Sequence, residues 1–175
     1  MTTTYYIVAD MSRAVESRGM KESGSSFECP EYMVLVGRSH RGDENGTTYY
    51  RSAYIVVDQN VKGESPQIEL IDHKWESAGK QSRLDYKAPD GWVITGRSHK
   101  GDENGVTNFR ISRVKIDNTL AQTVNEVTSD SMNENSTHYD TPAIGNLKSC
   151  ITGMSHSGDE NGQSTYTSRL LFFSA

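Results

Sequence analysis

The chain has 175 residues, of which 34% are hydrophobic and 9% aromatic, and this length suits one compact domain or three interdependent repeats. Its 18 basic and 23 acidic residues give a net charge of −5, which argues against nucleic acid as a partner, because nucleic-acid modules carry a concentrated basic surface. Since the sequence shows neither a run of 18 apolar residues nor a signal peptide, we expect no transmembrane segment. We expect a soluble protein that is cytoplasmic, or secreted or released without a recognisable signal.

The first expected strand is YYIV, from Tyr5 to Val8, and its counterparts are QIELI at 67–71 and QTVNEV at 122–127. A polar stretch rich in Ser, Gly and Lys follows each of these strands. A short second strand is then expected, ending at an aromatic residue that stands three positions before a proline. These aromatic and proline pairs are Phe27 and Pro30, Tyr86 and Pro89, and Tyr139 and Pro142.

A third strand, MVLV, WVIT or CIT, leads into a loop with the pattern S-H-x-G-D-E-N-G, and a fourth strand leaves it. The glycine that precedes this pattern is Gly37, Gly96 or Gly153, so successive copies are 59 and 57 residues apart. The third copy has about four extra residues between its proline and its loop. No stretch shows sustained helical periodicity. The sequence therefore predicts an all-β chain of three tandem repeats, with approximate bounds 1–58, 59–117 and 118–175.

Three four-stranded repeats predict a single domain with pseudo-threefold symmetry, for which two architectures are available. A β-prism packs three four-stranded sheets as its faces, whereas a β-trefoil closes six hairpins into a capped barrel. The Gln-x-Trp pattern typical of a trefoil is missing, because neither Trp75 nor Trp92 stands in it. We therefore expect a β-prism, with the β-trefoil as the alternative.

The glycine and asparagine residues of the loop have a simple structural interpretation. Asn-Gly is a strong hairpin signal, because both central positions of a type I′ turn need a positive φ angle. Asn45 and Gly46 would form such a turn, and Gly42 would relieve the chain on the way in. Shape alone would then explain these positions.

Shape does not explain the histidine and the two carboxylates, which are identical in all three copies while their neighbours vary. One position between them is Arg41, Lys100 or Ser157. Fixed side chains beside variable ones indicate a shared task, and we expect ligand contact. The candidate ligand-binding residues are His40, Asp43, Glu44, Asn45, His99, Asp102, Glu103, Asn104, His156, Asp159, Glu160 and Asn161.

Three chemistries fit these residue types. His, Asp and Asn could bind sugar hydroxyl groups, with Tyr50, Phe109 or Tyr166 stacking on the apolar face of the ring. Calcium is possible if the loops supply carboxylate oxygens, although each loop offers fewer protein oxygens than calcium prefers; its ligands would be Asp43, Glu44, Asp102, Glu103, Asp159 and Glu160. If the loops met on a threefold axis, a zinc ion could be held by His40, His99 and His156. No cofactor is otherwise expected.

Catalysis is not expected, because no nucleophile with a triad-like companion accompanies the histidines. Repetition suits binding better, since several weak sites on one molecule gain avidity. We therefore predict a trivalent, lectin-like module whose partner is a glycan or a glycosylated cell-surface receptor. The alternative is a calcium-binding or structural assembly module without glycan binding.

Two further features of the sequence are the residue before the loop and the pair of cysteines. Arg38 and Arg97 precede the loop in two copies, but Met154 takes their place in the third, so a ligand-contacting arginine would make the third site weaker. The two cysteines, Cys29 and Cys150, occupy different positions within their copies, so the repeat does not require a disulfide between them.

With three such loops on four-stranded units, the chain resembles the pseudo-threefold β-prism modules that form the C-terminal domains of bacterial insecticidal membrane-attack-complex/perforin proteins. The resemblance covers the whole chain and rests on the segment from His40 to Gly46 and its two recurrences. It implies recognition of a receptor or glycan on a target cell, beside a separate pore-forming domain, which these 175 residues lack. A free-standing lectin-like module, a partner toxin component or a homo-oligomer would all be consistent with this resemblance.

Overall fold

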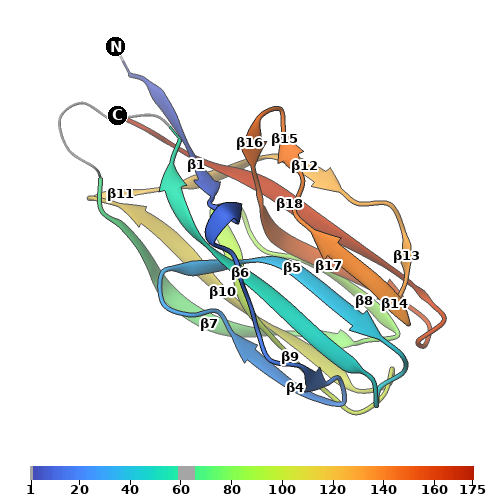
Figure 1. Cartoon of the computed structure of the whole chain (residues 1–175). Coiled ribbons are helices and arrows are strands. Elements are labelled where there is room, and N and C mark those ends of the chain that lie inside the picture. The colour runs from blue at the N-terminus through green and yellow to red at the C-terminus, as the bar shows by residue number, and fades with distance from the viewer. Residues whose placement is uncertain (1, 59–65) are drawn as a thin grey trace.

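A computed structural model of the chain describes residues 2–58 and 66–175, and antiparallel strands dominate it (Figure 1). The only helix in this part is a single 3-10 turn, η1 (Met11–Arg13). No helix in the described residues has the length and apolar character needed to cross a bilayer. The expected all-β class is therefore confirmed. The first residues of the expected second copy, 59–65, lie outside the described part.

Three long hairpins carry the repeated loops at their tips. Each hairpin joins the expected third and fourth strands of one copy, and both strands run further than the apolar segments in the sequence. The hairpin strands are β5 (Met33–Arg41) with β6 (Thr47–Val57), β9 (Trp92–Lys100) with β10 (Val106–Ile116), and β17 (Cys150–Ser157) with β18 (Gln163–Ser174).

One side of each hairpin pairs with strands of the same copy. The partners of β6 are β2 (Val15–Glu16) and β3 (Met20–Lys21), that of β10 is β7 (Ile68–Lys80), and those of β18 are β12 (Gln122–Thr128) and β13 (Met132–Asn133). Strand β7 continues through the polar stretch HKWESAGK, which was not expected to be a strand. Most of that half is exposed or half-buried, which explains why apolar alternation does not mark it.

The other side of each hairpin pairs with a short strand from a different copy. These short strands are β4 (Gly24–Glu28), β8 (Arg83–Lys87) and β14 (Ser136–Asp140), which are the expected second strands. The first copy gives β4 to β9, the second gives β8 to β17, and the third gives β14 to β5. The exchange thus runs around all three copies and returns to the first.

Strand β1 (Thr4–Ala9) lies between β6 and β18 and joins the first and third copies. The end of β6 pairs with β1, and the end of β10 pairs in the same way with the start of β7. The predicted equivalence of these first strands is therefore preserved in the pairing. Both chain ends lie at one end of the molecule, and the repeated loops lie at the opposite end (Figure 1).

The remaining strands are short. They are β11 (Thr119–Leu120), which pairs with β10, and the two-residue strands β15 (Ala143–Ile144) and β16 (Leu147–Lys148), which pair with each other. The β15–β16 hairpin accommodates most of the extra residues expected in the third copy, so the insertion leaves the larger hairpins unaltered.

The long strands bury residues on both faces near their centres. Each third strand carries a register shift, at Val36, Thr95 and Thr152, and all three of these residues are buried. Such a bulge bends the strand and increases its twist. Two clusters of buried residues result, one around Leu35, Ile94 and Ile151 and one that includes Val36 and Val93.

Cys29 and Cys150 are both free and buried, so the disulfide that the sequence left open is not present. Burial raises the pKa of each thiol to about 12. A buried thiol that stays protonated at neutral pH is a poor nucleophile, and we assign both cysteines to the hydrophobic core.

Candidate functional site

The S-H part of each motif belongs to the end of a strand, and the turn itself is made by D-E-N-G. In the first copy, the backbone N–H of Gly46 donates to the carbonyl oxygen of Asp43 at 2.9 Å, which closes a four-residue turn. The Oδ1 atom of Asp43 also accepts the backbone N–H of Asn45 at 2.8 Å. The other copies repeat both bonds, with the side-chain bonds at 2.9 Å and 2.8 Å.

The predicted type I′ turn is wrong. Neither Asn45 nor Gly46 has a positive φ angle, and Glu44 and Asn45 are the central residues of the turn. Aspartate at the first position and glycine at the last are typical of a type I turn instead. Gly42 does have a positive φ of 92°, as expected. Gly46 is required for a different reason, because a Cβ atom there would lie 1.9 Å from the carbonyl oxygen of Arg41.

The three histidines of the motif lie inside the protein. His40, His99 and His156 are each 3% exposed. In the first copy, Nε2 contacts the carbonyl oxygen of Gly42 at 2.8 Å and Nδ1 contacts the hydroxyl of Thr48 at 2.8 Å. Equivalent pairs of contacts hold the other two rings. Both nitrogens of each imidazole are therefore already used within the loop and its strand.

Backbone hydrogen bonds join the three loops into a ring. The segment at Glu22 and Ser23 donates two N–H groups to the first loop, and the carbonyl of Ser23 accepts the N–H of Gly101 in the second loop at 2.8 Å. Ser82 links the second and third loops in the same way, and Asn135 links the third and first. Each loop is thus fixed by two copies of the repeat.

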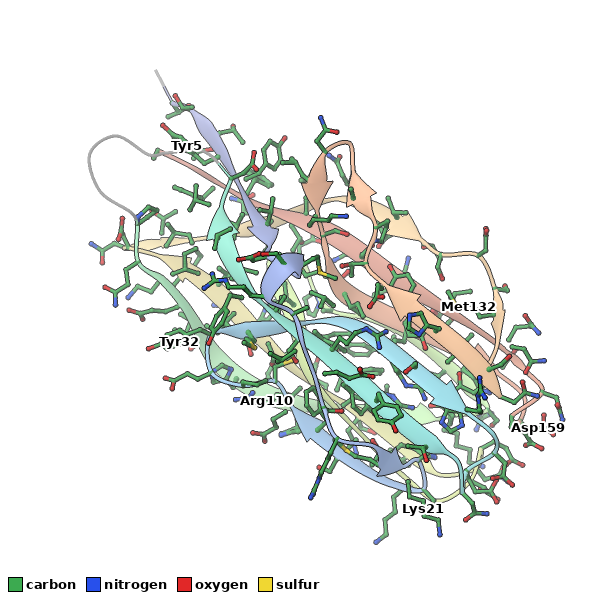
Figure 2. The ribbon with its side chains drawn as sticks, viewed as in Figure 1. Tyr5, Lys21, Tyr32, Arg110, Met132 and Asp159 are labelled. Carbon is green, nitrogen blue, oxygen red and sulfur yellow. The ribbon has the colours of Figure 1, made fainter. Side chains whose placement is uncertain are left out.

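The ring surrounds a narrow cavity with a volume of about 30 Å³, which is lined by His, Asp and Glu of all three motifs. This volume can hold a water molecule but not a sugar ring. The loops therefore form one composite surface rather than three separate ones. Asp43, Asp102 and Asp159 are exposed at its rim, and Glu44, Glu103 and Glu160 are half-buried. Figure 2 shows Asp159 at this end of the molecule.

The arginine that precedes the motif is buried and faces inward. Arg38 is 2% exposed and Arg97 is 0% exposed. Arg38 Nη2 lies 2.7 Å from an oxygen of Glu134, and Arg97 Nη1 lies 2.8 Å from an oxygen of Glu22. Because both arginines face inward, their position does not support direct contact with a ligand. Met154 in the third copy therefore does not weaken that site through the loss of a ligand-contacting arginine.

The buried carboxylates are held in their ionised form. Burial by itself raises the pKa of Glu22, but the positive charges of Arg97 and Arg38 outweigh it and bring the pKa well below 4.5. Burial and Arg38 act in the same opposed way on Glu134, whose pKa is also lowered. The interior beneath the loops therefore contains two guanidinium groups and two carboxylates that balance one another.

The aromatic residues expected to stack on a sugar are unable to do so. Tyr50, Phe109 and Tyr166 are each at most 1% exposed. Each of them stacks on the aromatic residue before the proline in its own copy, with ring centroids 4.7, 4.7 and 4.5 Å apart. The repeated aromatic positions thus form core pairs, and the prediction of a sugar platform at these residues is wrong.

No group of three or more His, Cys, Asp or Glu side chains in the described ranges is arranged to hold a metal ion. The histidines face hydroxyl and carbonyl oxygens with both nitrogens, so they would have to break these contacts to bind zinc. The loop carboxylates, in contrast, take part in no ion pair within residues 2–58 and 66–175. They are the residues that could contact a cation or a polar ligand.

The buried residues that support the loops were not predicted from the sequence. Glu22, Gln81 and Glu134 each stand five positions before the aromatic residue of their copy, and a hydroxyl residue stands eight positions after each histidine. Both spacings were available as signals, because they recur in all three copies. The hydroxyl residues are Thr48, Thr107 and Ser164, and all three are buried.

The chain matches no protein-family model, no curated protein and no solved structure. The geometry of the loop end is therefore the basis for assigning a function. That geometry combines a rigid ring of three loops, exposed carboxylate and amide groups, and histidines that are committed to the interior.

Proposed function

We propose that the chain is a non-catalytic, lectin-like binding module of β-prism architecture, which recognises a glycan or a glycosylated receptor through its loop end. Three hairpins, each with a strand of its own copy on one side and an exchanged strand on the other, support the β-prism interpretation. The observation that carries the binding proposal is the uniform presentation of Asp and Asn at the rim of the ring.

Each rim aspartate has one carboxylate oxygen that accepts no hydrogen bond from the described residues. Asp43 uses Oδ1 to accept the N–H of Asn45, whereas its Oδ2 has no partner in the part of the chain that the structure describes. Asp102 and Asp159 have the same arrangement. An ionised carboxylate accepts strong hydrogen bonds from hydroxyl groups, and the neighbouring asparagine amide can donate one. These are the groups that vicinal sugar hydroxyls require.

The ring also explains why the loops would be effective together. Loops that are fixed before binding lose little conformational entropy when a ligand arrives. Three equivalent aspartate and asparagine pairs around one rim can contact neighbouring sugars of a branched glycan or of a dense surface, and this raises avidity.

The test separates two roles of the aspartate, which accepts the hydrogen bond of the turn and is proposed to contact the ligand. Replacing Asp43, Asp102 and Asp159 together by Asn removes the charge but keeps an oxygen that can accept the turn hydrogen bond. We expect this variant to keep the circular-dichroism spectrum and melting temperature of the wild type and to lose binding on a glycan array. The matched control is Arg41→Ser with Lys100→Ser, which copies Ser157 and should bind as the wild type does.

Two results would overturn the proposal: the wild type binds no glycan on the array, or the triple Asn variant binds as well as the wild type. Titration of the wild type with calcium alone, followed by native mass spectrometry with and without chelator, tests the calcium alternative. Calcium-dependent array binding would assign the same carboxylates to the cation.

The second candidate is a structural assembly module, in which the motif exists to fasten the three copies to one another. The buried histidines and the ring of backbone hydrogen bonds favour it. Under this reading the triple Asn variant and the wild type behave alike in every binding assay. A triple Asp→Ala variant would still melt at a lower temperature, because each lost turn bond contributes about 0.5–1.5 kcal/mol.

A further inference from the structure

The turn before β5 holds a tyrosine in a backbone conformation that suits glycine. Met33 N–H donates to the carbonyl oxygen of Pro30 at 3.0 Å, and Tyr32, the third residue of this turn, has a φ of 67°. The second copy closes the same turn with a bond of 3.0 Å between Trp92 and Pro89. There the third residue is Gly91, with a φ of 85°.

A bulky residue with positive φ is strained, and such strain persists where the side chain has a task. Tyr32 is 50% exposed, so burial in the core does not explain its presence. The comparison between the two copies therefore points to a function for the tyrosine ring that the second copy does not share.

The ring of Tyr32 borders a cavity with a volume of about 270 Å³. The turn and the end of β4, with Glu28, contribute to the lining, together with His73 of β7, Thr95 of β9 and Arg110 of β10. Figure 2 shows that Tyr32 and Arg110 lie away from Asp159 and the loop end. The size approaches that of small-molecule sites in proteins.

Arg110 and Glu28 are available to a ligand in this cavity. In the first copy, the equivalent arginine is Arg51, and its Nε donates a charged hydrogen bond to Asp140, the equivalent of Glu28. Arg110 and Glu28 form no such pair among the described residues, although both line the cavity. The second copy thus leaves open a polar pair that the first copy closes.

His73 adds a neutral donor or acceptor. Its Nδ1 atom contacts the hydroxyl of Ser112 at 2.5 Å, and Ser112 contacts Thr95 at 2.7 Å, which fixes the ring. Burial and the nearby charge of Arg110 lower the pKa of His73, so the imidazole is neutral at pH 7. Its Nε2 atom has no hydrogen-bond partner in residues 2–58 and 66–175.

We propose that this cavity binds a single neutral sugar ring, whose apolar face lies on Tyr32 and whose hydroxyl groups bond with Arg110, His73 and Glu28. One guanidinium group stands against the two carboxylates of Glu28 and Glu31, which disfavours an anionic ligand. An exposed aromatic ring beside mixed donors and acceptors matches the two faces of a pyranose. The site goes beyond the proposed function, because the loop residues take no part in it.

The experiment is an NMR titration of the full chain with methyl α-glucoside, methyl α-galactoside and methyl α-mannoside, followed by backbone amide shifts. We expect at least one glycoside to shift the amides of 28–33, His73 and Arg110. Tyr32→Gly, which copies the second copy and relieves the strain, should keep the fold and weaken this binding about tenfold. Arg110→Gln should weaken it as well, whereas Tyr32→Phe should retain it.

The triple Asn variant of the loop aspartates is the control that separates the two sites, since it should bind these glycosides at the cavity as the wild type does. If the loop proposal fails on the glycan array, this titration still decides the cavity proposal. The cavity proposal is overturned if no glycoside shifts these amides, or if Tyr32→Gly binds as tightly as the wild type.

Discussion

At the scale of single residues, the motif histidines form buried hydrogen bonds that hold each loop on its strand. The chain of contacts at His40 shows how. Thr48 donates its hydroxyl hydrogen to the ionised Glu22 at 2.5 Å, so the same oxygen has only lone pairs left for His40 Nδ1. Nε2 of the same ring contacts the carbonyl oxygen of Gly42, so the imidazole connects Glu22 and Thr48 to the loop.

The partner of the hydroxyl group differs between the three copies. His156 contacts Ser164, whose hydroxyl donates to the ionised Glu134 at 2.6 Å, so this ring is connected to a buried carboxylate in the same way. The second copy has Gln81 in place of the glutamate, and its Oε1 accepts hydrogen bonds from Thr107 at 2.6 Å and from Arg97 Nη2 at 3.3 Å. Burial and the charge of Arg97 lower the pKa of His99, so we expect this ring to be neutral.

We predict that long-range ¹H–¹⁵N spectra at pH 7 show one protonated nitrogen in His99. A doubly protonated His99 ring at this pH would contradict the prediction. Because the folded-state pKa of His99 lies below its ordinary value of 6.5, its contribution to stability is present above pH 6.5 and is lost as the pH falls through the folded-state pKa. His99→Asn should remove this part of the pH dependence.

At the scale of strands, the exchanged pairs carry the buried charges. When β14 pairs with β5, it brings Glu134 to Arg38, and when β4 pairs with β9, it brings Glu22 to Arg97. The remaining exchange, between β8 and β17, places Gln81 and Met154 at the equivalent positions. Both members of the ion pair are thus replaced together, which leaves no buried charge without a partner.

This joint replacement predicts a strong coupling. Met154→Arg alone should destabilise the fold by about 3–5 kcal/mol, because it buries one charge without a counterion. Gln81→Glu alone should cost less, because its carboxylate would lie beside Arg97, whose Nη2 is 3.3 Å from Gln81 Oε1. Together they should recover at least about 1 kcal/mol of the summed loss, measured by urea unfolding in a double-mutant cycle. The reverse cycle, Glu22→Gln with Arg97→Met, is the matched control. Additive losses in both cycles would show that the charges act independently.

Strands and loops could be predicted from the sequence, but their partners could not. The repeated aromatic and loop positions indicate where β4, β8 and β14 lie, because period and spacing are local properties of the chain. Which hairpin each short strand joins depends on the folded arrangement of all three copies. The polar half of β7 was missed, since an edge strand with an exposed face shows no apolar alternation.

The candidate site was predicted in part for a related reason. The repeat identified the loop residues but not which way their side chains point, so the histidines and rim aspartates looked alike in the sequence. Burial separates them, because His40 is 3% exposed whereas Asp43 lies at the surface. The left-handed Tyr32 gave no signal, since a φ angle is not visible in one sequence.

At the scale of the whole molecule, the three copies form a closed cycle in which no copy completes its own sheet. Each hairpin needs a strand from another copy, and each loop needs a backbone segment from another copy. The ion pair between Arg38 and Glu134 connects the two ends of this cycle across 96 residues. Removing one copy therefore disturbs both of the others.

A chain that ends at Asp117 tests this closure. It retains two hairpins, but β5 loses β14 as its edge partner, β8 loses its own partner β17, and Arg38 loses the carboxylate of Glu134. Unpaired strand edges and an uncompensated buried charge both oppose folding. We expect the truncated chain to lack a cooperative thermal transition by circular dichroism and to elute as aggregates, or as an oligomer that restores the exchange, in size-exclusion chromatography. A stable monomer with a sharp transition would show instead that two copies form a self-sufficient unit and that the third merely covers them.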